Sequence, residues 1–249
     1  MLPTKNGEKT ITTPPGNRAS QPGSAEEKIA ELKKSLEFTQ KKLQIVGSVT
    51  RHDVLNQLTA IVGYTDLLLM MVQDPKLKSF IEKENHAIAR IQRQFRFSKD
   101  FQNIAVESPI WQILKDIVHQ ESEEISLGSI HVSDETGMVS VYADPLFPKV
   151  IFNLFDNTVR HAGSASEIHI AIRRVPGFAV LIVEDNGAGI PLDEKEKIFE
   201  RGFGKDTGWG LFLAREILAG SGMTITETGE PGKGARFEIM IPEEKFRMD

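Results

Sequence analysis

The feature that most constrains the fold is a long, uninterrupted apolar repeat near the start of the chain. Its members recur at alternating steps of three and four residues: Ile29, Leu32, Leu36, Thr39, Leu43 and Val46. This spacing gives a helix one apolar stripe, the a and d pattern of a coiled coil. With a shift in phase, the stripe continues through Leu55, Leu58, Val62, Thr65 and Leu69. No proline interrupts residues 25–74, so we predict one helix of about 70 Å.

The sequence Gln73-Asp74-Pro75 predicts where this helix ends and a second one begins. Asp74 can cap a helix N-terminus, and Pro75 suits the first helical position. The second helix has its own apolar stripe, formed by Leu77, Ile81, Ile88, Ile91, Phe95 and Phe101. Two long amphipathic helices with a short connection predict an antiparallel hairpin over residues 25–105. Because one hairpin buries only part of its stripes, we expect a homodimer whose hairpins form a four-helix bundle. Periodicity alone fits a plain coiled-coil spacer equally well.

Residues 106–249 are predicted to form a mixed domain. Six segments are typical of strands: 130–133, 139–142, 168–173, 179–183, 223–228 and 235–241. Helices are expected at 111–120, after Asp144-Pro145, and at 210–220. The first two strands are expected to be joined by the turn Glu135-Thr136-Gly137. Helices on one face of a largely antiparallel sheet give an α+β fold built as an α/β sandwich.

Composition excludes several classes of function. The net charge of −5 and the pI near 5.8 argue against a nucleic-acid-binding surface, which needs a basic patch. The chain has no cysteine, so neither disulfides nor thiolate metal sites can form. No apolar run approaches the roughly 20 residues that cross a bilayer. We therefore expect no membrane segment and a cytoplasmic location. Residues 1–24 are rich in proline and poor in apolar residues, which is typical of a disordered tail or an artificial extension.

Three glycine-bearing segments of the second domain are weak signals singly, but their order along the chain is informative. They are Asp185-Asn186-Gly187-Ala188-Gly189-Ile190, Gly208-Trp209-Gly210-Leu211 and Gly232-Lys233-Gly234-Ala235. None fits a Walker A loop or a Rossmann fingerprint. They follow a helix on which Asn153 and Asn157 lie one turn apart. An amide oxygen there is a hard ligand suited to Mg²⁺, and Asp185 can accept a hydrogen bond from an exocyclic amine.

These segments resemble the nucleotide-binding boxes of histidine kinases. Asn153-Leu154-Phe155-Asp156-Asn157 is similar to their N box, and residues 185–190 are similar to their G1 box. Ile198-Phe199-Glu200-Arg201-Gly202-Phe203 resembles the F box, and residues 208–211 resemble the G2 box. Arg51-His52-Asp53-Val54-Leu55-Asn56-Gln57-Leu58 resembles the H box, on the first hairpin helix. The resemblance covers residues 45–242 and implies a GHKL-type ATP-binding domain at 106–249.

The resemblance implies a role for each matching position. Asn157 would be the Mg²⁺ ligand, with Asn153 nearby and Arg160 or His161 touching the phosphates of ATP. Asp185 would bind the adenine amino group, and the backbone around it would flank the base at Gly187, Gly189 and Ile190. Two aromatic residues, Phe199 and Phe203, would anchor a mobile lid. The next helix would begin against the phosphates at Gly208, Gly210 and Leu211, where its backbone N–H groups favour negative charge.

His52 is the residue that we expect to be phosphorylated. Neutral imidazole carries a ring nitrogen able to attack a phosphoryl group, and Asp53 can orient the ring through its other nitrogen. Asn56 lies one turn later on the same face. The resemblance implies transfer from His52 to the aspartate of a response-regulator receiver domain, and a phosphatase role for Asn56. The other histidines show no metal-ligand spacing.

The sequence departs from the commonest family pattern at three places. Gln57 stands where a proline is usual, so the helix should bend less there. The stretch from Phe203 to Gly208 is short, which implies a small lid. Ala235 stands where many relatives have threonine, and the missing hydroxyl is expected to weaken nucleotide affinity.

Two other functions compete with the kinase interpretation. One is a binding or phosphatase module that no longer uses ATP; the intact Asn153, Asn157 and Asp185 argue against it. The other is a GHKL ATPase clamp, in which ATP drives dimer closure and His52 is incidental. The His-Asp-x-x-Asn sequence on the hairpin argues against that one.

Overall fold

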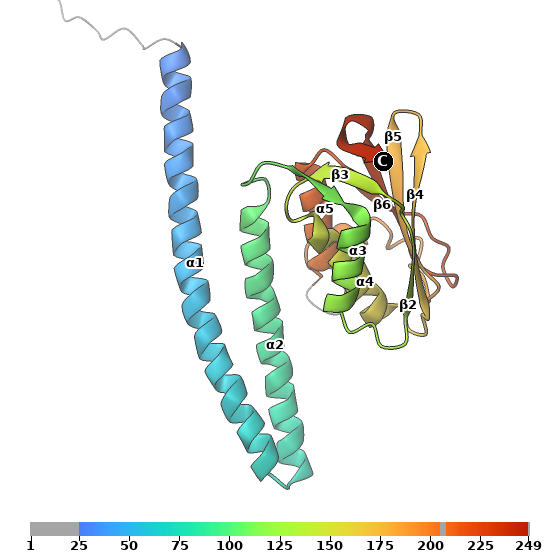
Figure 1. Cartoon of the computed structure of the whole chain (residues 1–249). Helices are drawn as coiled ribbons and strands as arrows, with labels where there is room; N and C mark the ends of the chain where they lie inside the picture. Colours follow the sequence, from blue (N-terminus) through green and yellow to red (C-terminus); the bar gives the residue numbers. More distant parts are fainter. Residues whose placement is uncertain (1–24, 205–207, 249) are drawn as a thin grey trace, which may run out of the picture. The chain divides into compact units, whose positions relative to one another are not determined.

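The computed structural model describes residues 25–204 and 208–248 (Figure 1). The predictions for residues 1–24, and for the middle of the short lid at residues 205–207, lie outside this range. The chain divides into two units, Met1–Val46 and Gly47–Asp249. The described part of the first unit is the N-terminal half of helix α1 (Ala25–Met71). There the predicted stripe is exposed: Ile29, Leu32, Leu36, Leu43 and Val46 are each 52–69% accessible.

In the second unit, the rest of α1 and helix α2 (Pro75–Asn103) form the predicted hairpin. Asp74 caps α2 by accepting hydrogen bonds from Lys76 N at 2.7 Å and Leu77 N at 3.4 Å, as predicted. Three apolar side chains of the hairpin are buried: Leu58, Ile81 and Ile88. Two side-chain hydrogen bonds join the helices, from Thr65 Oγ1 to Asn85 Oδ1 at 2.6 Å and from Arg51 Nη1 to Gln102 Oε1 at 2.5 Å. Many other apolar side chains of the hairpin remain exposed.

Helix α1 also bears on the expectation that the chain contains no membrane segment. By length and composition alone, α1 is able to cross a membrane. This is weak evidence for a membrane-spanning helix, because an exposed apolar helix face can pack against another helix just as well as against lipid.

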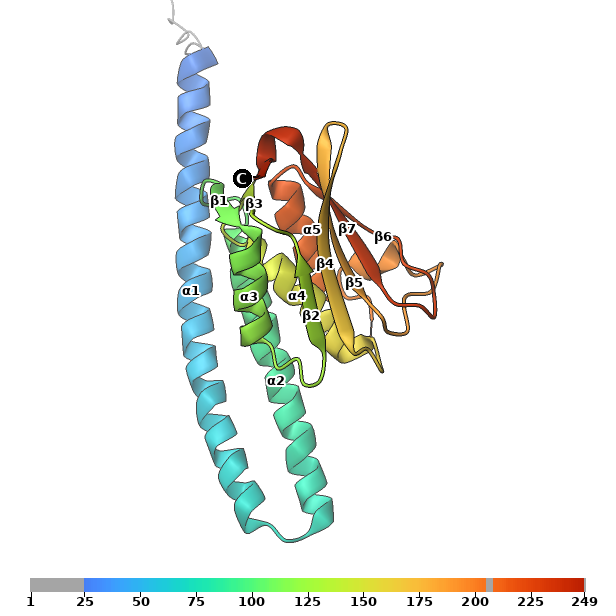
Figure 2. The ribbon, with the colours of Figure 1, turned by 45° about the vertical axis from the view of Figure 1, so that its right-hand side comes forward.

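The remaining residues of the second unit form an α+β domain, as predicted (Figure 2). Its main sheet has the order β2-β4-β5-β7-β6, in which only the β2–β4 pair is parallel. The strands are β2 (His131–Glu135), β4 (Glu167–Val175), β5 (Phe178–Asp185), β6 (Thr224–Glu227) and β7 (Arg236–Pro242). One face of this sheet is covered by α3 (Leu114–Glu124), α4 (Phe147–His161) and α5 (Gly210–Gly220).

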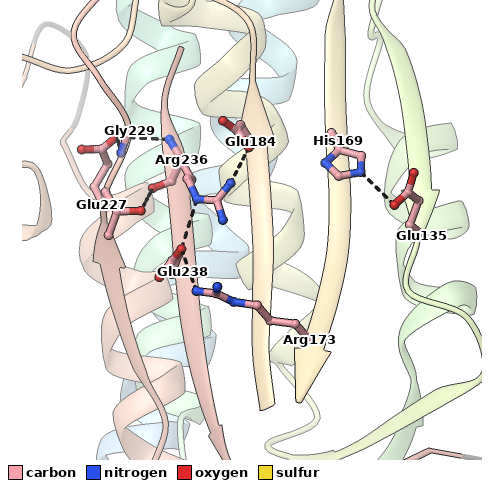
Figure 3. A network of polar contacts seen from close by, with 9 residues as sticks. Glu135, His169, Arg173, Glu184, Glu227, Gly229, Arg236 and Glu238 are labelled. Carbon is pink, nitrogen blue, oxygen red and sulfur yellow. Dashed lines mark hydrogen bonds and ion pairs between the residues drawn. The ribbon is translucent and has the colours of Figure 1, made fainter. Parts of the chain in front are cut away.

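The two faces of the main sheet differ in chemistry because side chains alternate along each strand. Ile168, Ile170, Leu181 and Ile239 are buried in the core beneath the helices, together with Phe147 and Phe155 of α4. The opposite face carries interlocked charges (Figure 3). There Arg236 contacts Glu184 at 2.6 Å and Glu238 at 3.1 Å, and Arg173 reaches Glu238 at 3.4 Å. Because the core side chains of these strands lie on one face of the sheet, the helices α3, α4 and α5 pack on that face.

A second, three-stranded sheet corrects two of the sequence predictions. It has the order β1-β3-β8, with β1 (Ile110–Ile113), β3 (Val139–Ala143) and β8 (Phe246–Met248). Residues 111–113 are therefore a strand and not the start of a helix, because Trp111 pairs with Tyr142 across the sheet. β2 and β3 belong to different sheets, so they do not form the expected hairpin. β8 was not predicted at all; it is three residues long.

The helix expected after Asp144-Pro145 begins slightly later, at Phe147. Asp144 is buried and accepts hydrogen bonds from two backbone amides, Leu146 N at 2.8 Å and Ala105 N at 2.7 Å. The carboxylate therefore joins the end of the hairpin to the start of α4. This contact sets where α4, the helix carrying both asparagines, enters the domain.

Candidate functional site

The described residues enclose a cavity of about 420 Å³ between the C-terminal half of α4 and the start of α5. Helix α4 lines it with Asn153, Asp156, Asn157, Arg160 and His161. The connection from β5 to α5 adds Gly189, Ile190, Phe203, Gly208, Gly210 and Leu211 among others. All predicted nucleotide-binding residues except Asp185, Gly187 and Phe199 thus line one cavity. Trp209, from the segment that resembles the G2 box, lines it too, and so does Arg93 of α2, which the sequence alone gave no reason to expect.

The two asparagines of α4 are among the residues that line this cavity. Both are half-buried, and within the described residues neither amide makes a hydrogen bond. Asn153 Oδ1 lies so close to Gly210 that a methyl group at Gly210 would approach it to 3.1 Å. No group of three His, Cys, Asp or Glu residues in the described ranges could hold a metal ion by itself. Mg²⁺ that arrives with a nucleotide needs only one or two protein ligands, so the free Asn157 oxygen fits it.

Asp185 ends strand β5 behind the cavity wall and is only 5% exposed. Its Oδ1 accepts hydrogen bonds from Gly187 N at 2.9 Å and Ala235 N at 3.2 Å. Its Oδ2 accepts one from the Thr158 hydroxyl at 3.0 Å. Thr158, on α4, was not singled out from the sequence. It supplies this carboxylate with a hydroxyl although Ala235 has none.

The glycines around Asp185 allow backbone segments to meet closely. A methyl group at Gly187 would lie 2.4 Å from Ala162 O, at the end of α4. Gly234 has φ +123°, and a methyl group there would lie 1.7 Å from Asp185 O. Gly232 N donates to Ala188 O at 2.8 Å. The turn between β6 and β7 is thereby packed against the residues that follow Asp185.

A buried ion pair holds the same turn to Lys195, in the segment between β5 and α5. Glu227 has a fully buried side chain, and Lys195 Nζ contacts both its Oε2 and Gly229 O. Glu227 Oε1 accepts hydrogen bonds from Gly229 N at 3.0 Å and Arg236 N at 3.1 Å (Figure 3). Phe199 is buried nearby, edge-on to Phe237 at 6.3 Å. It is thus placed in the core rather than in the cavity.

The start of α5 forms the other wall of the cavity. Gly208 has φ +61°, and its carbonyl accepts a hydrogen bond from Gly202 N at 3.0 Å, so the chain folds back beside Phe203. Trp209 follows and packs on Phe97 of α2, with the ring centroids 4.5 Å apart. The helix begins at Gly210. The N–H groups in the first turn of a helix have no partner within that helix. This end of the cavity therefore suits a phosphate group.

The three predicted catalytic residues form a separate group on α1. His52 and Asp53 are exposed, and His52 Nδ1 lies 3.3 Å from Asp53 Oδ1. Asn56 Nδ2 lies 3.3 Å from both ring nitrogens of His52. None of the three lines the cavity. The structure therefore brings together the residues within each group but does not bring the two groups into contact.

Two carboxyl groups outside the cavity are affected by burial. Burial raises the pKa of Asp100 on α2, and Lys149 is the largest of the opposing influences. Burial also raises the pKa of Glu121 on α3, where Lys149 again opposes the shift and Glu124 adds to it. Glu121 Oε2 is buried and has no hydrogen-bond partner. Neither group touches the cavity, so both belong to the framework around it.

Comparison with known proteins identifies relatives of this chain. Residues 144–245 match the family described as histidine kinase-, DNA gyrase B-, and HSP90-like ATPases. The alginate biosynthesis sensor protein KinB of Pseudomonas aeruginosa is 39% identical over 99 residues, which are 38% of this chain and 17% of KinB. The sensor kinase CckA of Brucella abortus is 31% identical over 235 residues, which are 81% of this chain and 24% of CckA.

Solved structures show the same architecture. The crystal structure of full-length ShkA in complex with AMPPNP matches with a TM-score of 0.60 at 20% identity, over 79% of this chain and 45% of ShkA. At that identity the likeness shows the fold alone. The chain spans less than half the length of each of these three proteins.

Proposed function

Because the chain belongs to the sensor histidine kinases, we propose that it binds ATP and phosphorylates its own His52. The observation that carries this proposal is the cavity lined by Asn153, Asn157 and the start of α5. It combines free amide groups with a helix N-terminus, which suits a magnesium-bound polyphosphate. Asp185 then offers the remaining acceptor capacity of Oδ2 to the adenine amino group.

Each residue of the cavity has a proposed part in holding ATP. Asn157 would hold Mg²⁺, which neutralises phosphate charge when bound, and Asn153 lies beside it. Arg160 and His161 would touch the phosphates. Gly187, Gly189 and Ile190 would flank the base. Phe199 would anchor the lid in the core, while Phe203, Gly208, Gly210 and Leu211 would close around the phosphates.

The phosphoryl transfer is proposed to occur at His52 Nε2. Its lone pair forms a bond to the γ-phosphorus as the bond from that phosphorus to the β,γ-bridging oxygen breaks, and ADP leaves with that oxygen. Nδ1 keeps its proton and donates it in a hydrogen bond to Asp53, which stabilises the positive ring. The proton then passes to solvent through the exposed carboxylate. Catalysis otherwise consists of positioning and charge neutralisation.

The exposure of His52 supports a second transfer, to a partner protein. An aspartate oxygen of a response-regulator receiver domain would form a bond to the phosphorus as the N–P bond breaks. In a separate hydrolysis, Asn56, one helical turn from His52, would orient a water molecule against the phosphorylated aspartate of the partner. The water oxygen would bond to phosphorus as the bond from phosphorus to the aspartate oxygen breaks, releasing inorganic phosphate. A second copy of the chain would cover the exposed apolar stripes of the hairpin, giving a homodimer. Use of ATP favours a cytoplasmic site for these reactions.

The test is incubation with Mg²⁺ and γ-labelled ATP, followed by detection of acid-labile label on the protein. We expect label on the unaltered chain and at least a 100-fold loss in His52→Ala, on the scale expected for removing a reacting group. His86→Ala, an exposed histidine on α2, serves as the matched control. ATP hydrolysis without label on the protein would favour an ATPase clamp. Loss of phosphatase activity in Asn56→Ala, with no labelling of the unaltered chain, would favour a phosphatase module.

A further inference from the structure

The cationic side chain of Arg93 has no anion in the part of the chain that the structure describes. Its Nε is buried and lacks a hydrogen-bond partner, and no ion pair or other polar contact of Arg93 occurs among the described residues. Arg93 as a whole is half-buried, and withdrawing even part of a charge from water without a partner is costly, so such groups are usually paired. The side chain nevertheless lines the nucleotide cavity. A site of this kind suits an anionic ligand.

The position of Arg93 within the cavity indicates which part of a nucleotide it would meet. A second, adjoining hollow shares several residues with the first, among them Arg93, Asn153 and Gly210. It does not include Gly189 or Ile190, which belong to the proposed base end. Arg93 therefore lies at the end of the cavity where α5 begins. That is where the phosphates are expected.

Three acidic residues line the adjoining hollow with Arg93, namely Asp100, Glu124 and Asp156, and none of them contacts Arg93 among the described residues. Glu124 pairs with Lys149 at 3.8 Å. Asp156 accepts a hydrogen bond from Arg160 Nε at 2.7 Å, one turn along α4. Arg93 itself is held beside the cavity by its own helix. Phe97, four residues later on α2, packs on Trp209 and Phe212 with ring centroids 4.5 Å and 6.2 Å away. The guanidinium is thus positioned without being neutralised.

Building on the proposed ATP binding, we propose that Arg93 is a ligand of the terminal phosphates, supplied by the hairpin helix. Guanidinium groups bind phosphate through paired, charge-assisted hydrogen bonds. The nucleotide would then contact α2 as well as α4 and α5. ATP would tie the hairpin to the nucleotide-binding domain through its phosphates, whereas adenosine would bind the domain without this link.

The test measures Mg²⁺-dependent binding of ATP, ADP and adenosine to the full chain by calorimetry. We expect Arg93→Gln to weaken ATP roughly tenfold, the scale of one charge-assisted contact, to weaken ADP less, and to leave adenosine unchanged. Arg93→Lys should recover part of the ATP affinity. The matched control is Arg90→Gln, an exposed arginine on the same helix, which should change ATP affinity less than twofold, about the scale of surface substitutions.

Two results would overturn the assignment of Arg93. One is an equal loss for adenosine and ATP, which would mean that Arg93 only supports the fold. The other is an ATP affinity of Arg93→Gln equal to that of Arg90→Gln. Failure of the unaltered chain to bind ATP would refute the proposed function itself. The two proposals therefore fail in distinguishable ways.

Discussion

Two aspartates of this chain, Asp53 and Asp185, are proposed to act in the same reaction from opposite environments. The side chain of Asp53 is 68% exposed, and its one contact is the 3.3 Å approach to the neighbouring His52. Asp185 is 5% exposed and accepts three hydrogen bonds, one from Gly187 N two residues later and two from distant segments, at Thr158 and Ala235. The exposed carboxylate of Asp53 is free to adjust as His52 reacts first with ATP and then with the receiver domain of a response regulator. The buried one has a single orientation, which suits recognition of one base.

Among the variants considered, substitution of Asp185 should cause the largest loss of stability and of ATP affinity. A small loss would contradict the contrast drawn between Asp185 and Asp53. Asp185→Asn replaces an acceptor oxygen with a donor among three donors, so we expect a loss of about 1–3 kcal/mol in the free energy of unfolding. ATP affinity should fall at least tenfold, because the amine of adenine loses its acceptor, on the scale of about 1.4 kcal/mol per tenfold.

Asp53→Asn is the matched control, measured by urea unfolding and calorimetry. It should change the free energy of unfolding by less than about 0.5 kcal/mol and leave ATP affinity unchanged while slowing phosphorylation of His52. Equal unfolding midpoints for the two variants would contradict the proposed division of roles.

A third carboxylate, Glu121, sharpens the comparison because it is as buried as Asp185 but poorly paired. Its pKa is raised by burial and, to a lesser degree, by Glu124, against the influence of Lys149. The folded state therefore binds this proton more tightly than the unfolded state does. The contribution of Glu121 to stability is largest at low pH and falls as the pH rises from the unfolded value of about 4.5 through the folded pKa.

We expect Glu121→Gln to raise the free energy of unfolding at pH 7 by about 1 kcal/mol, because an unpaired charge is removed from the core. Its advantage over the unaltered chain should shrink as the pH is lowered toward 5. Urea unfolding at both pH values measures this. Asp116→Asn, on the exposed side of α3, should show no such pH dependence. An advantage that grows at low pH would contradict the interpretation.

The smallest expected effect concerns Ala235, where the sequence implied that a missing hydroxyl weakens nucleotide affinity. Thr158 already donates a hydroxyl to Asp185, so we expect Ala235→Thr to change ATP affinity less than threefold, well below the scale of a full hydrogen bond to a charged group, about 1.5–3 kcal/mol. The same substitution in a Thr158→Val background should have a larger effect, because the carboxylate then lacks a hydroxyl donor. Calorimetric titrations of the four chains form a double-mutant cycle. Identical effects in both backgrounds would show that the two positions act independently.

The sequence predicted elements whose determinants are local. The cap and proline at Asp74-Pro75 define the start of α2 in any context, and the structure has them there. The glycines after Asp185 and before α5 were recognised from the order of their segments and from the resemblance to the nucleotide-binding boxes. Strand pairing was harder to predict. Trp111 is a strand residue only because β3 lies opposite it, and β8 is too short to have a pattern of its own.

The missed residues of the candidate site share one property, which is that their function depends on the fold. Thr158 reads as one polar residue on an amphipathic helix, and only the packing of α4 against β5 brings it to Asp185. Arg93 is one of several basic residues on α2. Nothing in the sequence distinguishes it from Arg90, although one lines the cavity and the other is exposed to solvent.

The contact between Gly234 and the carbonyl of Asp185 has a consequence for heredity. Every amino-acid change reachable by one base substitution in a glycine codon introduces a side chain, and here even a methyl group would lie 1.7 Å from the carbonyl oxygen. No single base substitution at Gly234 can therefore change the surroundings of the Asp185 carboxylate by a small amount. Descendants of this gene are expected to keep this glycine, or to lose the proposed adenine site along with it.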